Sequence, residues 1–255
     1  MPIGQTNFPG IYISTQTSAR EEPYKTQVES ALEKIAAGSS GSALLQGLST
    51  ISARKNRKVT IAEIGAEAQP NTRAVLSASE VEKYDPETFA DNLALAKERA
   101  RKGKGCNAII EWSPHSNIEL NSNGSPLRLG SNPEESFVVL AHELIHAQHL
   151  LAGTSKAYKG GDRYDETSEA GKEELRAVGV GKYEYRKTRQ PSENSIRQEH
   201  GLPIRKNISL TAGEAAYRSS LPRHLHQCPG LSMGLPGLRT RSGSCAAANS
   251  SSKMY

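Results

Sequence analysis

The chain has 255 residues, of which 36% are hydrophobic and 23% charged, and its mean hydropathy is −0.58. This length is enough for one medium domain or two small ones with a buried core. A membrane-spanning helix needs about 20 mostly apolar residues. The longest apolar stretch, residues 136–151, is interrupted by three histidines and a glutamate, so the sequence predicts no membrane span.

The N-terminal segment and the cysteines indicate how the protein is handled in the cell. The first 18 residues lack a basic start, an apolar core and a small-residue cleavage site, so we expect no cleaved signal peptide. Residues 1–22 are rich in polar residues without periodicity, which predicts a disordered segment. The three cysteines are widely spaced and form no CxxC motif, which indicates a reducing compartment.

Positive charge is concentrated in the last third of the chain. Residues 181–255 carry 12 Lys and Arg but only 4 Asp and Glu. These positive residues are scattered and show no aromatic-interleaved module, so we expect no nucleic-acid partner. From residue 222 the sequence turns to Gly, Ser, Pro and Ala, which predicts a flexible basic tail over 222–255. Residues 23–221 are then the expected folded domain.

Apolar periodicity and turn residues predict a mixture of helices and strands. Before the central helix we expect helices over 24–37, 42–53 and 85–101 and strands over 58–64 and 107–112. Residues 117–120 and 127–129 are expected to pair as a hairpin across an Asn- and Gly-rich turn. After the central helix we expect helices over 168–178, 192–200 and 212–219. This mixture predicts the α+β class, with a small mixed sheet.

The central helix is the best-defined element. Asn132 is a good N-cap, Pro133 suits the first helical position, and Gly153 ends the segment. Between these signals the residues are apolar almost all the way round the helix, which indicates a buried helix.

This helix contains the motif His142-Glu143-Leu144-Ile145-His146. Residues four apart share a helix face, so both imidazoles can bind one metal ion. Glu143 lies about 100° round the helix from His142 and can reach a water on that metal without ligating it. Zinc lowers the pKa of bound water to about 7, and a neighbouring carboxylate then removes the proton. The motif therefore predicts a catalytic Zn²⁺ site with Glu143 as the base.

A catalytic zinc needs a third protein ligand and an open fourth position. The metzincin pattern is excluded, because His149 and Ala152 stand where it requires Gly and His. His149 is one turn too far along the helix to ligate and is expected beside the ligand set or at its rim. The downstream carboxylates that could ligate are Asp162, Asp165, Glu166, Glu169, Glu173 and Glu174.

A ligand on a second helix is favoured over a loop, because a rigid element fixes geometry better. This argument favours Glu173 and Glu174, of which one ligates and the other orients a histidine, since adjacent helical residues face different ways. The alternative is that both are solvated charges on a surface helix.

The segment HELIHAQHLLAG, followed by EELRAVG, resembles the zinc site of clostridial neurotoxin light chains. The chain resembles more closely the NleD-like zinc metallopeptidases, effectors that bacteria deliver by type III secretion. Residues 40–45 (SGSALL) and 193–205 (ENSIRQEHGLPIR) also match blocks of that family. The resemblance covers residues 25–210 and implies a zincin-like fold.

The resemblance also implies roles for individual residues. His142, His146 and Glu174 would hold the zinc, and Glu173 would lie behind them. Arg205 would be a catalytic group that stabilises the oxyanion.

The related enzymes often place a Tyr three residues after this Arg, where the present chain has Ile208. Tyr183 and Tyr217 are the candidates to replace it.

The predicted function is therefore that of a zinc-dependent endopeptidase. The resemblance implies delivery through a type III secretion apparatus, or with its chaperone, into the host cell cytoplasm. It also implies a host signalling protein as substrate, with mitogen-activated protein kinases as the first candidates. The substrate backbone is expected to lie along the sheet edge beside the helix, by strand addition.

Two alternatives stay open. One is a hydrolase of a non-peptide amide or ester. The other is a non-catalytic zinc-containing effector that binds and sequesters a host protein. The missing Tyr favours this second alternative, and the intact Glu143 counts against it, because a structural metal site has no use for a base.

Overall fold

A five-stranded mixed sheet forms the centre of the described structure, a computed structural model that describes residues 3–209. Its strands are β1 (Ile3–Gln5), β2 (Ile11–Ser14), β3 (Val59–Glu63), β4 (Asn71–Val75) and β5 (Asn107–Trp112). Their order across the sheet is β1-β2-β3-β5-β4. The central strands β2, β3 and β5 run parallel, and β1 and β4 are antiparallel to their neighbours at the two edges.

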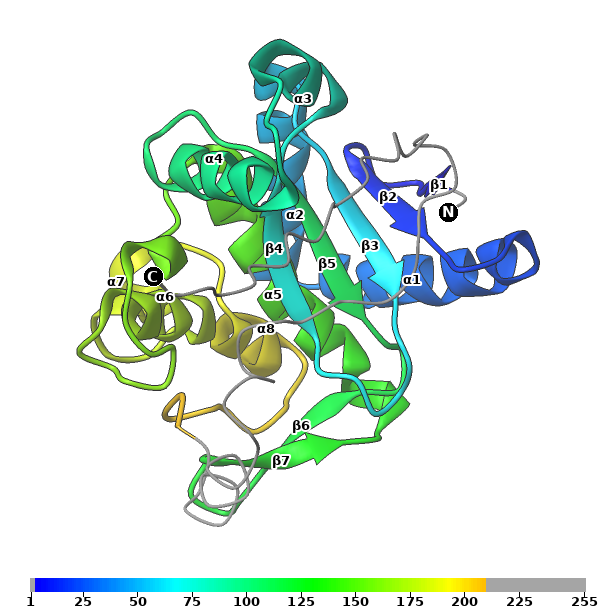
Figure 1. Ribbon diagram of the computed structural model, residues 1–255. Helices are drawn as coiled ribbons and strands as arrows, with labels where there is room; N and C mark the ends of the chain where they lie inside the picture. Colours follow the sequence, from blue (N-terminus) through cyan, green and yellow to red (C-terminus); the bar gives the residue numbers. More distant parts are fainter. Residues whose placement is uncertain (1–2, 210–255) are drawn as a thin grey trace, which may run out of the picture. The chain divides into compact units, whose positions relative to one another are not determined.

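Helices surround this sheet (Figure 1). The α-helices are α1 (Glu21–Ala36), α2 (Ser39–Lys55), α3 (Ala78–Tyr84), α4 (Phe89–Arg101), α5 (Ser136–Ala152), α6 (Glu169–Val178), α7 (Tyr185–Thr188) and α8 (Glu193–Glu199). Short 3₁₀ helices are η1 (Ser18–Arg20), η2 (Pro133–Glu135), η3 (Ala157–Lys159) and η4 (Gly181–Tyr183). A separate hairpin consists of β6 (Asn117–Leu120) and β7 (Pro126–Gly130).

Helix α5 packs against β4 and β5 on one side and against α2 on the other (Figure 1). The predicted α+β class, with a small mixed sheet beside the helix that carries His142 and His146, is confirmed. The Trp112 indole at the end of β5 donates a hydrogen bond to the Ser136 carbonyl at 3.1 Å, which fixes the start of α5 against the sheet. At the other end, Gly153 adopts a left-handed conformation with φ of 81°, which a residue with a Cβ adopts only with strain.

Two sequence blocks that are far apart in the chain meet where α2 begins. Glu199, at the end of α8, accepts hydrogen bonds from the Ser39 hydroxyl and the Ser40 amide, both at 2.7 Å. A carboxylate at this position satisfies a free N–H group of the helix and is favoured by the helix dipole. Gly41 has no room for a side chain, since a Cβ would lie 1.8 Å from the Ile35 carbonyl oxygen. Blocks 40–45 and 193–205 are therefore in contact through α2 and α8.

The prediction of disorder over residues 1–22 is wrong from Ile3 onward. Residues Ile11–Ser14 form a strand that pairs in parallel with β3, and α1 begins at Glu21. Ile11 and Ile13 are 1% and 0% exposed. A strand of four residues is too short for apolar periodicity to reveal it. Its stability also comes from pairing with a strand more than 40 residues away, which local sequence does not show.

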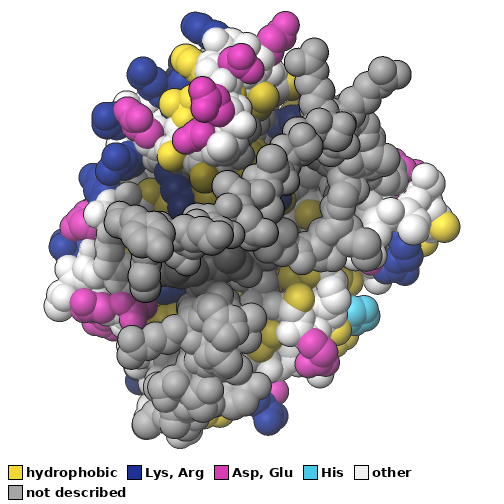
Figure 2. All heavy atoms as spheres, viewed as in Figure 1, with side chains coloured by type: hydrophobic (Ala, Val, Ile, Leu, Met, Phe, Trp, Pro, Cys, Tyr) yellow, Lys and Arg dark blue, Asp and Glu magenta, His cyan; other side chains and the backbone are white. Residues whose placement is uncertain are grey.

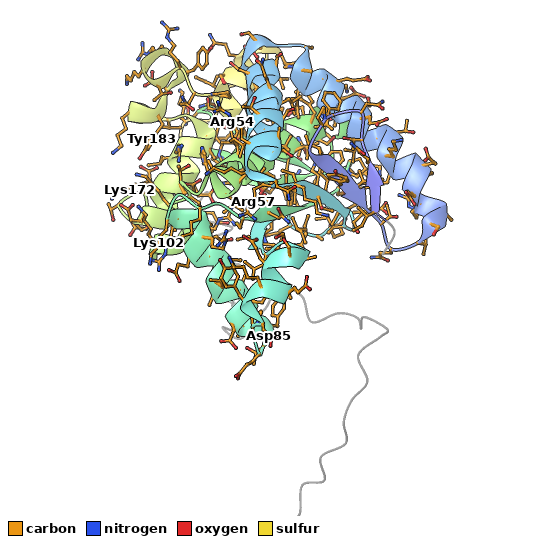
Figure 3. All side chains as sticks on the ribbon, turned by 90° about the horizontal axis from the view of Figure 1, so that it is seen from above. Arg54, Arg57, Asp85, Lys102, Lys172 and Tyr183 are labelled. Carbon is orange, nitrogen blue, oxygen red and sulfur yellow. The ribbon has the colours of Figure 1, made fainter. Side chains whose placement is uncertain are left out.

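Further differences lie between β3 and β5. Strand β4 and helix α3 were not predicted, and the helix expected from residue 85 begins only at Phe89. Its N-cap is Thr88, whose hydroxyl accepts from the Asp91 amide at 3.1 Å. Asp85 instead ends α3 with φ of 42° and lies at the outer end of this connection in Figure 3. The expected helix over 212–219 and the expected tail lie outside the described residues.

Acidic, basic and hydrophobic side chains are mixed on the face in Figure 2. The exposed hydrophobic residues include Tyr84 and Phe89, on either side of the connection between α3 and α4. No helix among residues 3–209 is long and apolar enough to cross a membrane.

The first strands of the sheet should contribute to stability as core elements do. We expect Ile13→Ala to lower the free energy of unfolding by about 2–5 kcal/mol, because it removes a fully buried side chain and leaves a cavity. Ile3→Ala is the matched control, since Ile3 is 56% exposed and its truncation should cost less than about 0.5 kcal/mol. Urea denaturation measures both. Equal small effects would contradict the placement of β2 in the core.

Candidate metal centre

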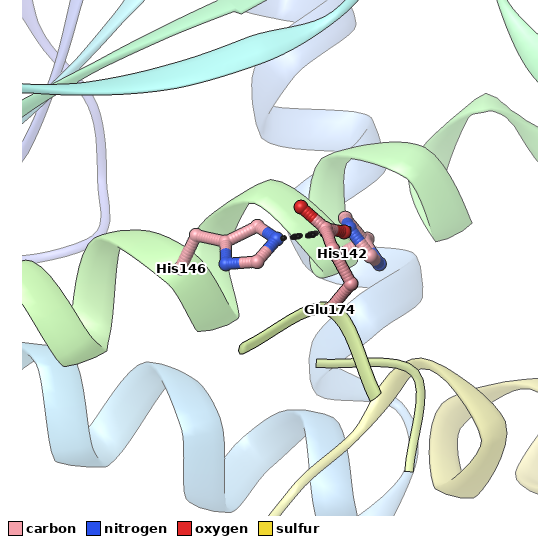
Figure 4. A group of neighbouring side chains, drawn as sticks. All are labelled: His142, His146 and Glu174. Atoms are coloured by element: carbon pink, nitrogen blue, oxygen red, sulfur yellow. Dashed lines mark hydrogen bonds and ion pairs between the residues drawn. The ribbon is translucent and has the colours of Figure 1, made fainter. Parts of the chain in front are cut away.

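Side chains from two helices converge in the interior beside the sheet (Figure 4). His142 and His146 lie one turn apart on α5, and their Nε2 atoms are 3.0 Å from each other. Glu174 comes from α6, and its Oε2 lies 3.3 Å from His142 Nε2 and 3.5 Å from His146 Nε2. Ser168 fixes the start of α6, because its hydroxyl accepts from the Gly171 amide at 2.9 Å. The three predicted ligands are therefore brought together.

These three atoms fit a tetrahedral zinc ion. At the usual zinc bond lengths of about 2.0–2.2 Å, two ligand atoms in a tetrahedron are about 3.4 Å apart. The observed separations of 3.0–3.5 Å match that value. Two imidazole nitrogens and one carboxylate oxygen are also the donor set of many catalytic zinc sites, which leave a fourth position open.

A carboxylate lies next to the Nδ1 atom of each of the two imidazoles, on the side away from the metal position. Glu193 Oε2, on α8, lies 2.9 Å from His142 Nδ1, and Glu173 Oε1 lies 3.5 Å from His146 Nδ1. A proton on each Nδ1 would face these carboxylates, which leaves both Nε2 lone pairs directed at the metal position. Glu174 thus lies with the two histidines, and Glu173 lies behind His146. The ligand role of Glu174 stays a prediction.

His149 belongs to the support of the site. Its Nδ1 lies 2.5 Å from Glu173 Oε1, and the Lys156 amide donates to Glu173 Oε2 at 2.9 Å. His146, His149 and Glu173 also form a second group whose ligand atoms lie within 4.8 Å of one another. Both oxygens of Glu173 already have hydrogen-bond partners. We therefore interpret this group as a hydrogen-bond network that fixes His146, and not as a second metal site.

Sequence reasoning missed Glu193, although it matched the block that contains this residue. Glu193 Oε1 accepts from Arg197 Nε at 2.8 Å, and Glu193 Oε2 lies 3.3 Å from Arg205 Nη1. Glu193 and Arg197 are 2% and 1% exposed. The available signal was the Ser192 N-cap followed by a Glu and an Arg four residues apart on one helix face.

Arg205 reaches the site through Glu193. Its Nε donates to the Asn207 carbonyl at 3.0 Å and its Nη2 to the Ile208 carbonyl at 3.3 Å. All three of its nitrogen atoms therefore have a partner, and the residue is 9% exposed. Its expected contact with a substrate carbonyl stays a prediction.

Two further residues at the site were not predicted. The Thr72 hydroxyl on β4 donates to Glu143 Oε2 at 2.6 Å. Arg163, from the loop before α6, places Nη2 2.8 Å from Glu174 Oε1, and its side chain is 43% exposed. Arg163 therefore binds the carboxylate oxygen that points away from the two histidines. Neither residue lies in a recognisable motif, because a strand and a loop bring them to the site from elsewhere in the chain.

Tyr183, one of the two candidates to replace the missing Tyr, contacts two lysines and, in the part of the chain that the structure describes, not the candidate metal ligands. The Tyr183 ring lies beside the ammonium groups of Lys156 and Lys182, at 6.0 and 5.2 Å from its centre. Within residues 3–209, the contacts of Tyr183 include none of the three candidate ligands. Tyr217 lies outside the described residues.

The charges at the site shift the pKa values of its members. Burial lowers the pKa of His146, but the charge of Glu174, with contributions from Glu173 and Glu143, outweighs burial and raises this pKa to about 10. Burial raises the pKa of Glu174, yet His146 and Arg163 hold it well below its usual value. These charges therefore favour a proton on His146, and a metal ion that binds His146 must displace it.

The comparison with known families agrees with this geometry. A model of peptidase family M91, described as effector proteins, matches residues 13–207. The chain belongs to peptidase family M91. The match spans every residue of the candidate metal centre, and it confirms the family of effector peptidases that the HELIH and EEL segments indicated. No curated protein matches the chain in sequence.

Several solved structures are similar to this member of family M91. The catalytic domain of Clostridium botulinum neurotoxin serotype F matches with a TM-score of 0.43 and 14% identity, over 75% of this chain and 58% of that one. The botulinum neurotoxin type G light chain matches with a TM-score of 0.36 and 14% identity, over 57% of this chain and 44% of that one. The chain spans about half the length of the solved structures that it matches.

The buried charge of Glu193 should be needed for folding. We expect Glu193→Gln to lower the free energy of unfolding of the metal-free protein by about 3–5 kcal/mol, because it leaves two buried arginines without their counter-charge. The control is Glu184→Gln, whose partners Arg186 and Lys187 are exposed and whose change should cost less than about 1 kcal/mol.

The pH dependence of this difference follows from the pKa of Glu193. Burial raises that pKa, but the charges of Arg197 and Arg205 outweigh burial and lower it. A lowered pKa in the folded state gives stability that is present above the unfolded value of about 4.3 and lost as pH falls below it. Urea unfolding at pH 7 should therefore show the full difference in the free energy of unfolding between the wild type and Glu193→Gln. This difference should narrow below about pH 4. A difference independent of pH would contradict this account.

Proposed function

We propose that this M91 peptidase is a zinc-dependent endopeptidase whose metal is held by His142, His146 and Glu174. The observation that carries the proposal is the convergence of their three ligand atoms at 3.0–3.5 Å. When bound, zinc supplies a Lewis acid that polarises the scissile carbonyl and makes water acidic enough to deprotonate near neutral pH.

The remaining chemistry belongs to side chains of this chain. Glu143 accepts the proton of the attacking water and later passes it to the leaving amine. Glu143 follows His142 on α5 and is 4% exposed, so bulk water does not compete for its carboxylate. Glu173 and Glu193 keep the two imidazoles in the tautomer that the metal requires.

Positive charge is available for the oxyanion of the transition state. Arg163 touches Glu174 and has a half-exposed side chain, so part of its guanidinium can face a bound substrate. Arg205 is buried, and its contacts support a role in holding Glu193. A donor to the oxyanion contributes on the order of 10²–10³ in turnover.

The substrate class follows from the sheet. Strand β4 is an edge of the sheet and contacts α5 beside Glu143. An extended peptide can add to such an edge through main-chain hydrogen bonds, which are independent of side-chain identity. This arrangement favours a peptide over a small amide or ester, because only a peptide uses an extended edge.

Membership of an effector family supports a host protein as substrate. We propose type III secretion from a bacterium as the route and the host cell cytoplasm as the place of action. The substrate is then a host signalling protein, and mitogen-activated protein kinases are the first to test.

The alternative is an effector that binds and sequesters a host protein while its zinc site has no catalytic role. The Ile208 that replaces the expected Tyr is the observation in its favour. A Glu143→Gln protein that retained the full effect in host cells would support this alternative.

The base provides the direct test of catalysis. We expect zinc-loaded wild type to cleave members of a peptide library made from a eukaryotic cell lysate, and Glu143→Gln to lower kcat/KM on those peptides by about 10²–10⁴-fold while keeping its zinc. Mass spectrometry of new peptide termini measures the cleavage. Glu134→Gln, at the exposed start of the same helical segment, should cleave as the wild type does. Equal cleavage by Glu143→Gln and wild type would contradict the proposal.

A further inference from the structure

Thr72 makes the shortest described hydrogen bond to the predicted base. Its hydroxyl donates to Glu143 Oε2 at 2.6 Å and lies 3.1 Å from the backbone carbonyl oxygen of the same glutamate. A hydrogen bond to a charged carboxylate is shorter and stronger than a neutral one. The bond occupies one oxygen of Glu143 and leaves Oε1 for the proton of the attacking water.

The backbone of Thr72 has a second function available to it. Successive residues of a strand direct their N–H and C=O groups to opposite edges, so Thr72 and Ala74 share an edge. The Ala74 amide donates to the Tyr158 hydroxyl at 3.1 Å, so this shared edge is the one away from β5. Thr72 therefore directs its N–H and C=O groups outward, while its side chain reaches Glu143 on α5.

Tyr158 limits where a peptide can pair with this edge. Its hydroxyl already occupies the outward amide of Ala74, and its ring is packed against the core. Thr72 lies two residues before Ala74 on the same edge and contacts Glu143. The Tyr158 hydroxyl does not occupy the outward N–H and C=O groups of Thr72. Among residues 3–209, the part of this edge that Tyr158 leaves unoccupied thus lies at the residue that holds the base.

We propose that Thr72 is the positioning residue of Glu143 and that an extended substrate pairs with β4 at Thr72. The inference rests on the proposed peptidase function and deepens it. Thr72 then positions both reacting partners: its hydroxyl fixes the carboxylate of Glu143, and its backbone groups fix the main chain of the substrate peptide. Misplacement of reacting groups by about 1 Å can cost on the order of 10² in rate, so this link has a measurable effect.

Substitution at Thr72 separates the two roles. Val has almost the shape of Thr and keeps the backbone groups but lacks the hydroxyl. We expect Thr72→Val to lower kcat by about 10- to 100-fold on a peptide that the wild type cleaves, with KM changed by less than about twofold. Thr72→Ser restores the hydroxyl and should recover kcat to within about threefold of the wild type. The control is Thr60→Val on β3, which makes the same change two strands away in the same sheet and should leave kcat and KM unchanged.

A purely structural role for Thr72 gives a different result. Thr72→Val would then lower thermal stability and change kcat and KM together, and Thr72→Ser would not restore kcat selectively. An unchanged kcat in Thr72→Val would also overturn the proposal.

A second measurement does not depend on activity. Crystal structures of zinc-loaded wild type and Thr72→Val should show Glu143 Oε2 within hydrogen-bond distance of Thr72 in the wild type and displaced in the variant, with equal zinc occupancy. A wild-type structure in which Glu143 has left Thr72 would overturn the proposal. Because this readout needs no cleavage, a wild type that cleaves nothing would contradict the peptidase function while the role of Thr72 is still decided.

Discussion

The burial of two imidazoles and a carboxylate on one apolar helix is the constraint on which the rest of the structure depends. His142, Glu143 and His146 are each less than 10% exposed, and a buried polar group costs free energy unless it has a partner. Helix α5 itself cannot supply these partners, because most of its other side chains are apolar. They must come from other elements, and the fold is arranged so that they do.

Three elements deliver the partners. Helix α6 brings Glu173 and Glu174, helix α8 brings Glu193, and strand β4 brings Thr72. The negative charge of this group requires compensation in turn, and Arg163, Arg197 and Arg205 provide it. A network of this kind is rigid when every member is satisfied. It also holds the ligand atoms in place before any metal arrives, as a catalytic site requires.

Local signals were enough to predict the helices with strong apolar periodicity and clear caps. The central helix, the spacing of its two histidines and the Glu173-Glu174 pair on a following helix all follow from such signals. The first strands escaped prediction because four residues carry too little periodicity, and their burial depends on pairing with β3. Strand β4 escaped for the same reason, since its residues Asn71–Val75 are mostly polar and are defined by their partner β5.

The site residues also divide into those that local sequence signals indicated and those that only the fold brings together. The spacing of the two histidines is a local property of α5, whereas Glu174 was singled out by the resemblance of the HELIH and EEL segments and lies beside the histidines. Thr72, Arg163 and Glu193 were missed, since the fold alone brings them to the site. Arg205 was singled out as a catalytic group, and the partners of its guanidinium are Glu193 and two backbone carbonyls. A residue type and its position in a motif indicate that a residue matters, whereas its contacts indicate how.

Zinc content per chain, measured by elemental mass spectrometry, tests the central claim most directly. The comparison is between the wild type, Glu174→Ala and Glu169→Ala, where Glu169 is a partly exposed residue of the same helix that pairs with Lys172. We predict one zinc per chain in the wild type and in Glu169→Ala, and a clear loss in Glu174→Ala. Full zinc retention in Glu174→Ala would contradict the ligand set, and a wild type that takes up no zinc would contradict the metal centre itself.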